Sequence, residues 1–199
     1  MDIISELNGK RILIWGYGRE GKATEHFLQR CVKPASVDIF EGKKEEIDED
    51  DYDFIIKSPG IVMNEENPKY TSETELFLQQ FRDQVIGITG TKGKSTTSAM
   101  LYTVLKACSG RPVLLLGNIG QPCLDYFEEV TEDTIIVYEM SCHQLAHTNV
   151  SPHIAIFLNL YEEHLDYYGT VEKYFEAKSH IAAYQKSGDY FFRSEERRV

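Results

Sequence analysis

The segment Gly90-Thr-Lys-Gly-Lys-Ser95 follows an apolar run, precedes a helical pattern, and has residue types that suit phosphate binding. Glycines let backbone N–H groups curl around an anion, and the N-terminus of the next helix adds its dipole. Lys94 supplies a positive charge and the Ser95 hydroxyl can ligate Mg²⁺. The general phosphate-loop pattern wants a glycine at position 88, where this chain has Ile88, so Gly90 must shape the turn. We expect ATP and Mg²⁺ here; the alternative is a glycine-rich turn with an exposed lysine.

A second glycine motif, Gly16-Tyr-Gly18-Arg-Glu-Gly21, follows the first apolar run and opens the first helical pattern. This placement is the one that a dinucleotide or nucleoside-diphosphate site requires. Asp38, which we expect near the end of the next strand, would meet a ribose or a base, and Ser58-Pro59-Gly60 would form a turn at the same sheet edge. Tight packing between strand and helix would explain the glycines equally well.

Two further apolar runs carry polar residues where they end. Glu139 closes the run 135–139, and a strand-end carboxylate is how phosphate-loop enzymes hold Mg²⁺ or its water. The alternative is a glutamate on an edge strand that faces water. His164 and Asp166 follow the run 153–158, and a single histidine there is more often a structural hydrogen-bonding group than a ligand.

The last helical pattern contains a lysine where an apolar residue belongs. Val171, Tyr174, Phe175, Ile181 and Ala182 form an apolar stripe, and Lys178 stands on that stripe. An inward lysine needs a chemical reason, although its stem could also pass the aromatic rings and carry the ammonium to solvent.

Alternation of apolar runs with helical patterns predicts an α/β fold with parallel sheets and helices on their faces. Ser72-Glu-Thr-Glu75 has capping-box spacing, and we place a domain boundary near Gln84. The acidic stretch 41–51 is expected to be a solvated loop. Strands are expected at 11–15, 36–40, 53–57, 85–89, 112–116, 134–140 and 153–158, and helices at 20–30, 72–81, 95–108 and 171–185. Phe191 and Phe192 could begin one more strand.

Composition restricts the class of protein. The chain has 199 residues, and a hydrophobic content of 42% is typical of a globular protein. Its net charge of −11 gives it no basic surface that would attract nucleic acid. No apolar run approaches the ~20 residues that span a bilayer, and no leader pattern is visible, so we expect a cytoplasmic protein without membrane insertion. Cys31, Cys108, Cys123 and Cys142 show no C-x-x-C pair and are expected to be reduced thiols.

Taken together, these segments resemble the Mur ligase family, ATP-dependent amide-forming enzymes of peptidoglycan synthesis. The resemblance rests on five elements in order along nearly the whole chain. They are Gly90-Thr-Lys-Gly-Lys-Ser95, Gly117-Asn-Ile-Gly120, Glu139-Met-Ser-Cys-His-Gln-Leu145, His164-Leu-Asp166 and Ala177-Lys178. Cys142-His143 departs from the small-aromatic pair usual in the family, which we expect to change packing around the site more than its chemistry.

The resemblance implies a fold and a reaction. The fold would be a Rossmann-like domain at 1–84 for the UDP substrate, followed at 85–199 by the N-terminal part of a phosphate-loop ATPase-type parallel-sheet domain. In the family members that the first-domain motifs resemble most, ATP phosphorylates the carboxylate of UDP-MurNAc-L-alanine to an acyl phosphate, and the amine of D-glutamate displaces phosphate. Family members continue further, so we expect the adenine and amino-acid contacts to lie beyond this chain.

The resemblance also implies roles for individual residues. Lys94, His164 and Lys178 would be catalytic, with Lys178 carbamylated so that it ligates a metal. Ser95, Glu139, His164 and Lys178 would hold Mg²⁺. ATP would bind Gly90, Thr91, Lys92, Gly93, Lys94, Ser95 and Thr96. The substrate would bind Gly16, Tyr17, Gly18, Arg19, Gly21, Asp38, Ser58, Pro59, Gly60, Asn118, Ser141 and Gln144.

Three alternatives remain open at this point. The chain could be a non-catalytic fragment that binds a UDP-sugar or nucleotide without turnover. It could be an NAD-dependent oxidoreductase built on Gly16 to Gly21, or a ligase of the folylpolyglutamate-synthase kind. Binding and turnover measurements separate these possibilities.

Overall fold

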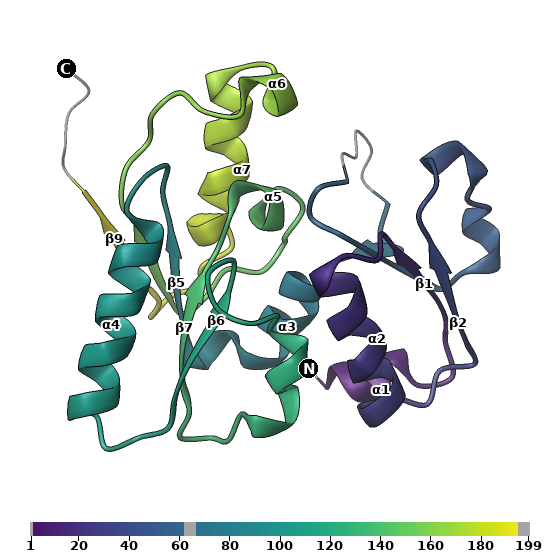
Figure 1. The fold of residues 1–199 in the computed structure, drawn as a ribbon, viewed down its shortest axis with the longest axis horizontal. Helices are drawn as coiled ribbons and strands as arrows, with labels where there is room; N and C mark the ends of the chain where they lie inside the picture. Colours follow the sequence, from purple (N-terminus) through teal and green to yellow (C-terminus); the bar gives the residue numbers. More distant parts are fainter. Residues whose placement is uncertain (1, 62–66, 195–199) are drawn as a thin grey trace. The chain divides into compact units, whose positions relative to one another are not determined.

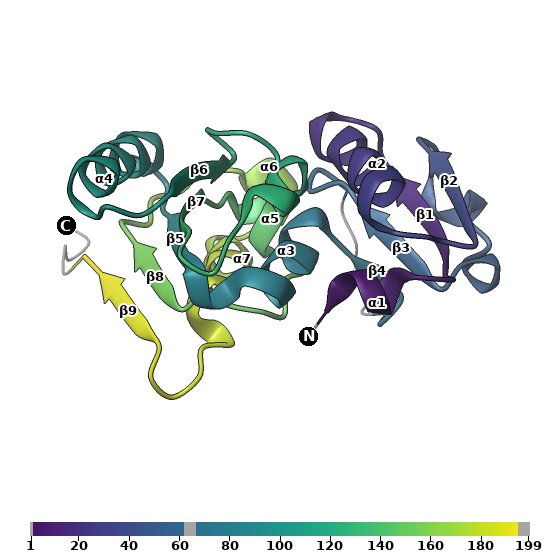
Figure 2. The ribbon, with the colours of Figure 1, turned by 90° about the horizontal axis from the view of Figure 1, so that it is seen from below.

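A computed structural model describes residues 2–61 and 67–194, which form two compact α/β units. The first contains residues 1–80 and 122–129, and the second contains 81–121 and 130–199. Figures 1 and 2 show both units, and each is described by itself below.

The first unit is built on a four-stranded parallel sheet in the order β2-β1-β3-β4. Its strands are β1 (Arg11–Trp15), β2 (Ser36–Phe40), β3 (Phe54–Lys57) and β4 (Tyr70–Thr71). Its helices are α1 (Ile3–Leu7), α2 (Arg19–Cys31) and α3 (Glu73–Phe81). A core of Leu13, Trp15 and Ile55 fixes one face of the sheet. The Ser72 Oγ accepts a hydrogen bond from Glu75 N, so Ser72 caps α3 and the helix begins one residue later than expected.

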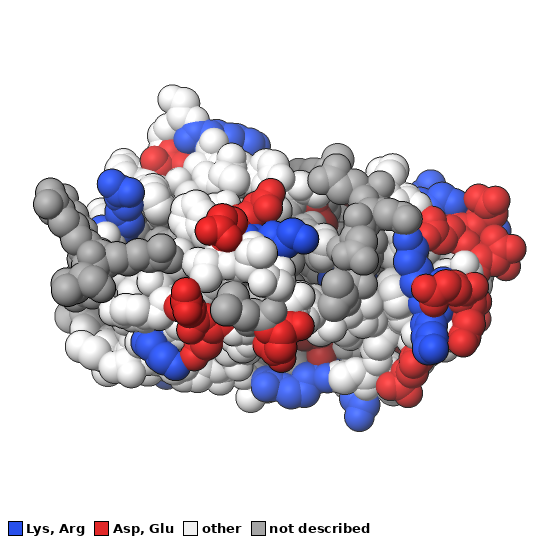
Figure 3. All heavy atoms as spheres, turned by 90° about the horizontal axis from the view of Figure 1, so that it is seen from above, with Lys and Arg blue, Asp and Glu red and all other residues white. Residues whose placement is uncertain are grey.

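The acidic stretch 41–51 is mostly exposed, as expected, but it is not a loop throughout. It contains two short 3₁₀ helices, Lys44–Glu46 and Glu49–Asp51, and the Tyr70 hydroxyl lies 2.7 Å from Glu49 Oε1. Ile47 and Tyr52 pack against the core. On the face in Figure 3, acidic side chains gather most densely over the β2 end of this unit, with basic side chains scattered around them.

A segment from the second half of the sequence completes the first unit. The 3₁₀ helix Leu124–Glu129 packs on α2, where the rings of Phe27 and Phe127 lie 4.7 Å apart. Leu124 N donates to the buried Glu73 carboxylate at 2.9 Å, and Arg30 pairs with Glu128 at 3.2 Å. The first compact unit therefore contains residues 122–129 as well as the chain up to Gln80.

The second unit is built on a five-stranded parallel sheet in the order β6-β7-β5-β8-β9, which Figure 2 shows in sequence. The strands are β5 (Val85–Thr89), β6 (Val113–Gly117), β7 (Ile135–Glu139), β8 (Ile154–Phe157) and β9 (Tyr190–Arg193). The helices are α4 (Lys94–Cys108), α5 (Cys142–Leu145), α6 (Leu165–Tyr168) and α7 (Val171–Ala183), and a 3₁₀ turn spans Arg82–Gln84. Helix α4 packs against β5, β6 and β7, and α7 packs against β5 and β8.

The inner strands of both sheets are continuous apolar runs because helices or loops cover their faces. In β7 the four residues Ile136 to Glu139 are buried, and in β1 the four residues Ile12 to Trp15 are buried. The expected strands agree with the structure to within a residue at each end. Cys31, Cys108, Cys123 and Cys142 are all free thiols. In the described part of the chain, no helix is both long and apolar enough to span a membrane.

Candidate functional site

The loop between β5 and α4 has the geometry of an anion cradle. Gly93 caps α4 with φ of +81°, in the left-handed region, and no side chain caps this helix. The N-terminal N–H groups of α4 are therefore available to an anion. The Lys94 Nζ donates to the carbonyls of Gly90 at 2.9 Å and Thr91 at 3.2 Å, so the ammonium lies over the loop.

The side-chain amide of Asn159 holds this loop in place, a role that the sequence analysis missed. Asn159 Oδ1 accepts from Thr91 N at 3.1 Å and from Lys92 N at 2.9 Å, and its Nδ2 donates to the Lys92 carbonyl at 3.0 Å. Its position two residues beyond β8, at the same sheet edge as the loop, was the available signal. Asn159 therefore acts as a positioning residue for the loop backbone.

Thr91 connects the loop to α7 and to the segment that precedes it. Its side chain is buried, and its Oγ1 accepts from Tyr161 N at 3.0 Å and lies 3.2 Å from the Tyr174 hydroxyl. Lys92 forms an ion pair with Glu163, which lowers the pKa of that carboxyl through the Lys92 hydrogen bond. The loop is thus preorganised by side chains far from it in sequence.

Glu139 lies on the strand next to the loop and has an oxygen without a donor. Residue Ile88 of β5 pairs with Glu139 in the register of the sheet. Glu139 is fully buried; its Oε1 accepts from Asn118 Nδ2 at 2.9 Å, whereas no hydrogen bond reaches Oε2. Since β7 is an inner strand, the alternative of a water-facing edge glutamate is wrong. A buried carboxylate oxygen without a donor fits a cation.

Asn118, Ser141 and Gln144 surround the ends of β6 and β7. Asn118 N donates to the Glu139 carbonyl at 3.0 Å. Ser141 and Gln144 form a reciprocal capping box on α5: Ser141 Oγ accepts from Gln144 N at 3.2 Å, and Gln144 Oε1 accepts from Ser141 N at 2.9 Å. Both side chains thus cap α5, in addition to the substrate binding expected of them.

Lys178 points into the protein from α7. It is 1% exposed, and its Nζ donates to the Gly90 carbonyl at 2.9 Å, the same oxygen that accepts from Lys94. Burial lowers the pKa of Lys178 to about 8, and the nearby Lys94 charge acts in the same direction. The expected apolar stripe is partly wrong, because Phe175 is 50% exposed and the buried face is Tyr174, Ala177, Lys178 and Ile181.

His164 belongs to an aromatic cluster at the start of α6. Its backbone has φ of +56°, which is uncommon for a residue other than glycine and marks local strain. Its ring lies 5.2 Å from the His143 ring, and the Tyr167 ring lies 4.4 Å from His143. His143, which with Cys142 departs from the family pattern, therefore packs directly against His164, the expected metal ligand.

The residues fit magnesium through oxygen donors. Among the described residues, no three His, Cys, Asp or Glu side chains converge as a metal site. Mg²⁺ is usually held by one or two carboxylates with substrate phosphates and waters, so one buried carboxylate near an anion cradle matches its needs. Glu139 is that carboxylate, and the Ser95 hydroxyl stands in the first turn of α4.

The glycine loop of the first unit contains three glycines, and close packing requires glycine at two of them. A Cβ on Gly16 would lie 2.7 Å from Ser58 Oγ, and one on Gly21 would lie 2.2 Å from the Gly16 carbonyl, so close packing explains both. A Cβ on Gly18 would meet nothing within 4 Å. Gly18 is also the N-cap of α2, without a side-chain cap. Packing alone therefore leaves Gly18 unexplained.

The other residues expected at this site are spread along the same sheet. Ser58 Oγ donates to the Gly16 carbonyl at 3.0 Å, which brings the 58–60 turn to the glycine loop. Tyr17 bonds to Glu25 through its hydroxyl, and Arg19 opens α2. Asp38 is exposed in the middle of β2 rather than at its end, and its charge helps to raise the pKa of Tyr52, after burial as the larger cause.

Comparison with known proteins identifies relatives of the chain. The Mur ligase middle domain matches residues 88–197. The UDP-N-acetylmuramoylalanine--D-glutamate ligase of Clostridium kluyveri is 36% identical over 81% of this chain and 37% of its own length. The ligase of the same name from Streptococcus pyogenes is 33% identical over 96% of this chain and 48% of its own length. The chain thus spans less than half of these two relatives.

A likeness to a solved structure accompanies these sequence matches. The crystal structure of MurF ligase from Thermotoga maritima in complex with ADP has 20% sequence identity and a TM-score of 0.48, over 95% of this chain and 44% of that one. The family match to more than half of the chain is the finding that decides membership, and it includes the 90–95 loop, Glu139, His164 and Lys178. The chain belongs to the Mur ligase family.

Proposed function

We propose that the protein containing this chain is an ATP-dependent ligase of peptidoglycan precursor synthesis, which adds D-glutamate to UDP-MurNAc-L-alanine. The observation that carries this proposal is the pairing of an uncapped α4 N-terminus bearing Lys94 with the buried Glu139, whose Oε2 accepts no hydrogen bond. The names of the relatives from C. kluyveri and S. pyogenes support the choice of amino acid. The expected cytoplasmic location is part of the same proposal.

In the proposed reaction, the substrate carboxylate takes the γ-phosphoryl group of ATP and ADP leaves, and the amine of D-glutamate then displaces phosphate from the acyl phosphate. The amides of residues 90–95 and the Lys94 ammonium bind the phosphate chain and stabilise charge on the transferring group. Ser95 and Glu139 would hold one Mg²⁺, and His164 with Lys178 would serve a second. Bound magnesium supplies positive charge that neutralises the phosphate oxygens.

Lys178 is suited to modification by CO₂. With a pKa of about 8, part of the lysine population carries a neutral amine near neutral pH. The amine nitrogen would attack the CO₂ carbon, an N–C bond would form as one C=O π pair moves to oxygen, and one N–H proton would leave to solvent. The product is a carbamate with one negative charge. This change would convert a cation that competes with Lys94 for the Gly90 carbonyl into a metal ligand.

The first unit would hold the UDP part of the substrate. The open space at Gly18 and the uncapped N-terminus of α2 support a diphosphate beside the glycine loop. Tyr17 lies on the loop beside this space, Arg19 and Gly21 lie in the first turn of α2, and Ser58, Pro59 and Gly60 lie on the turn after β3. Asp38 would approach the ribose or base only from the middle of its strand.

Two assays on the 199-residue chain test the proposal and separate it from the alternatives. Calorimetry with UDP-MurNAc-L-alanine measures binding to the first unit, and phosphate release from ATP with D-glutamate present measures turnover. Binding with turnover supports the ligase in this chain. Binding without turnover, together with turnover by the S. pyogenes relative, assigns this chain a binding role alone. Binding of NAD in place of the UDP substrate would contradict the proposal.

A further inference from the structure

Lys57 is a lysine buried at the C-terminal end of β3. It is 3% exposed, and in the sheet register it pairs with Trp15, the residue that precedes the glycine loop. A buried ammonium is costly unless other groups compensate its charge. Neither the loop at residues 90–95 nor the metal site uses this residue, so its position needs a reason of its own.

The surroundings of Lys57 come from three elements. Its Nζ donates to the Ile61 carbonyl at 3.2 Å. Burial lowers its pKa to about 8, and the carboxylates of Glu20 in α2 and Glu75 in α3 oppose that shift. Glu73 in α3 is also buried, with a pKa raised by burial and by Glu20. The Lys57 ammonium thus interacts with the Glu20 carboxylate in the first turn of α2.

The contact with Ile61 closes the turn that borders the glycine loop. Ser58 N donates to the Trp15 carbonyl at 2.8 Å, and Ser58 Oγ donates to the Gly16 carbonyl at 3.0 Å. Ile61 N donates back to the Ser58 carbonyl at 3.1 Å. One end of the turn is therefore fixed to the glycine loop, and the Lys57 ammonium fixes the other end.

We infer that Lys57 is a positioning residue for a nucleoside diphosphate bound by the first unit: its ammonium holds the Ser58–Ile61 turn against the Gly16–Gly21 loop and offsets the Glu20 charge beneath that loop. This inference rests on the proposed binding of a UDP substrate there. Without the ammonium, the Glu20 carboxylate in the first turn of α2 would repel the diphosphate, and the turn would lose its anchor at Ile61.

The test measures affinity for UDP, used as the probe, by calorimetry on the 199-residue chain. Lys57→Met is expected to weaken UDP binding about ten-fold, whereas Lys57→Arg keeps the charge and stays within about three-fold of the parent. Lys33→Met removes an exposed lysine of the same unit and is the matched control. Adding Glu20→Gln to Lys57→Met should restore part of the affinity, because the negative charge that repels the diphosphate is gone.

A pH series keeps the inference testable even where Lys57→Met folds poorly. The parent should lose UDP affinity as pH rises through about 8, where Lys57 loses its proton, and Lys57→Arg should be flat over the same range. Equal pH profiles for the parent and Lys57→Arg, or UDP affinity in a folded Lys57→Met within two-fold of the parent, would overturn the role of Lys57.

Gly18→Val distinguishes failure of this inference from failure of the proposed function. Because the Cβ of residue 18 would point into open space, valine should block UDP without disturbing the fold. If the parent binds UDP, Gly18→Val does not, and Lys57 variants bind normally, the proposed function stands and the inference falls. If the parent does not bind UDP, or Gly18→Val binds it as well as the parent does, the site itself is wrong.

Discussion

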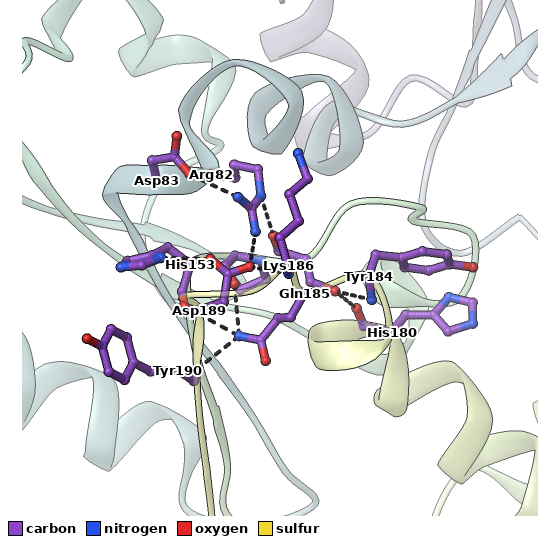
Figure 4. A network of polar contacts seen from close by, with 11 residues as sticks. Arg82, Asp83, His153, His180, Tyr184, Gln185, Lys186, Asp189 and Tyr190 are labelled. Carbon is purple, nitrogen blue, oxygen red and sulfur yellow. Dashed lines mark hydrogen bonds and ion pairs between the residues drawn. The ribbon is translucent and has the colours of Figure 1, made fainter.

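Buried charged groups are hydrogen-bonded differently at the two edges of the second sheet, where its strands begin and where they end. At the N-terminal edge, Asp189 accepts from Arg82 and from Lys186 N at 2.6 Å, and His153 Nδ1 lies 2.7 Å from it (Figure 4). At the C-terminal edge, no hydrogen bond reaches the Oε2 of buried Glu139, and two ammonium groups share the Gly90 carbonyl. The N-terminal ends of β5, β8 and β9 thus meet in a satisfied network, whereas the C-terminal end of β7 carries an unsatisfied carboxylate oxygen.

This difference indicates what each edge does. Arg82 also donates to the Ser151 carbonyl at 2.9 Å, so the network joins the start of the second unit to β8 and to the turn before β9. Such closed networks stabilise a fold. A buried charge that lacks a partner costs stability and is typical of binding sites, which supports the proposal that the C-terminal edge binds the ligand. Substitutions at the two edges should therefore change stability in opposite directions.

The largest effect is expected for Asp189→Ala. The change leaves the mostly buried Arg82 guanidinium without its main partner, and charged hydrogen bonds of this kind contribute about 2 to 3 kcal/mol. Chemical denaturation measures the free energy of unfolding. Asp83→Ala is the matched control, because Asp83 is the other, exposed partner of Arg82. If Asp189→Ala lowered the free energy of unfolding no more than Asp83→Ala does, the network would not stabilise the fold as proposed.

Acid titration sharpens the same point. Burial by itself would raise the pKa of Asp189, but hydrogen bonds from Lys186 N, His153 and Arg82 lower it to about 2. A carboxyl with a depressed pKa stabilises the fold above its unfolded value and loses that contribution as pH falls from about 4 to about 2. The parent should lose stability in that range more steeply than Asp189→Asn does, as followed by circular dichroism. Parallel curves would contradict the assignment.

At the opposite edge, Glu139→Gln should leave the ligand-free protein as stable as the parent or more stable by about 1 kcal/mol. The neutral amide keeps an oxygen for Asn118 and removes a buried charge. Thermal unfolding without and with MgATP provides the measurement, and Glu132→Gln, an exposed change in the same unit, is the control. Marked destabilisation without ligand, combined with unaltered stabilisation by MgATP, would show that Glu139 is only structural.

The smallest effect concerns the alkaline range and Lys178. Its pKa is lowered by burial to about 8, so the unfolded chain binds more protons above that pH and stability should rise with pH. Between about pH 7.5 and about pH 9 the gain should be about 1 kcal/mol, and Lys178→Met should remove it. Lys57 adds a similar rise in both proteins, so the difference between them isolates Lys178. If stability rose with pH as steeply in Lys178→Met as in the parent, the ammonium of Lys178 would have to reach solvent.

The sequence predicted the strands well because inner parallel strands are apolar runs. It also pointed to Lys178, because a lysine within an apolar stripe is conspicuous, although Phe175 proved to be exposed. It could not show the Asn159 contacts with the 90–93 loop or the Arg82–Asp189 pair, which join residues 67 and 107 positions apart. Such contacts depend on tertiary packing and leave no periodic pattern.

Short elements were the other gap. Helices α5 and α6 have four residues each, too few for a helical period, and Leu124–Glu129 joins the first unit through Phe127 and the Glu73 contact rather than through any local pattern. The sequence also could not show how the three glycines differ. Only the structure shows that close packing requires glycine at Gly16 and Gly21 but not at Gly18.

The most direct test of the central claim is the binding of MgATP to the 199-residue chain and to Lys94→Ala, measured by calorimetry. The account predicts saturable binding by the parent and a loss of about 1.5 to 3 kcal/mol, at least ten-fold, in Lys94→Ala. Lys106→Ala, which removes an exposed lysine from the same helix α4, should bind as the parent does. Equal affinity of the parent and Lys94→Ala for MgATP, with both proteins folded, would contradict a nucleotide site at this loop.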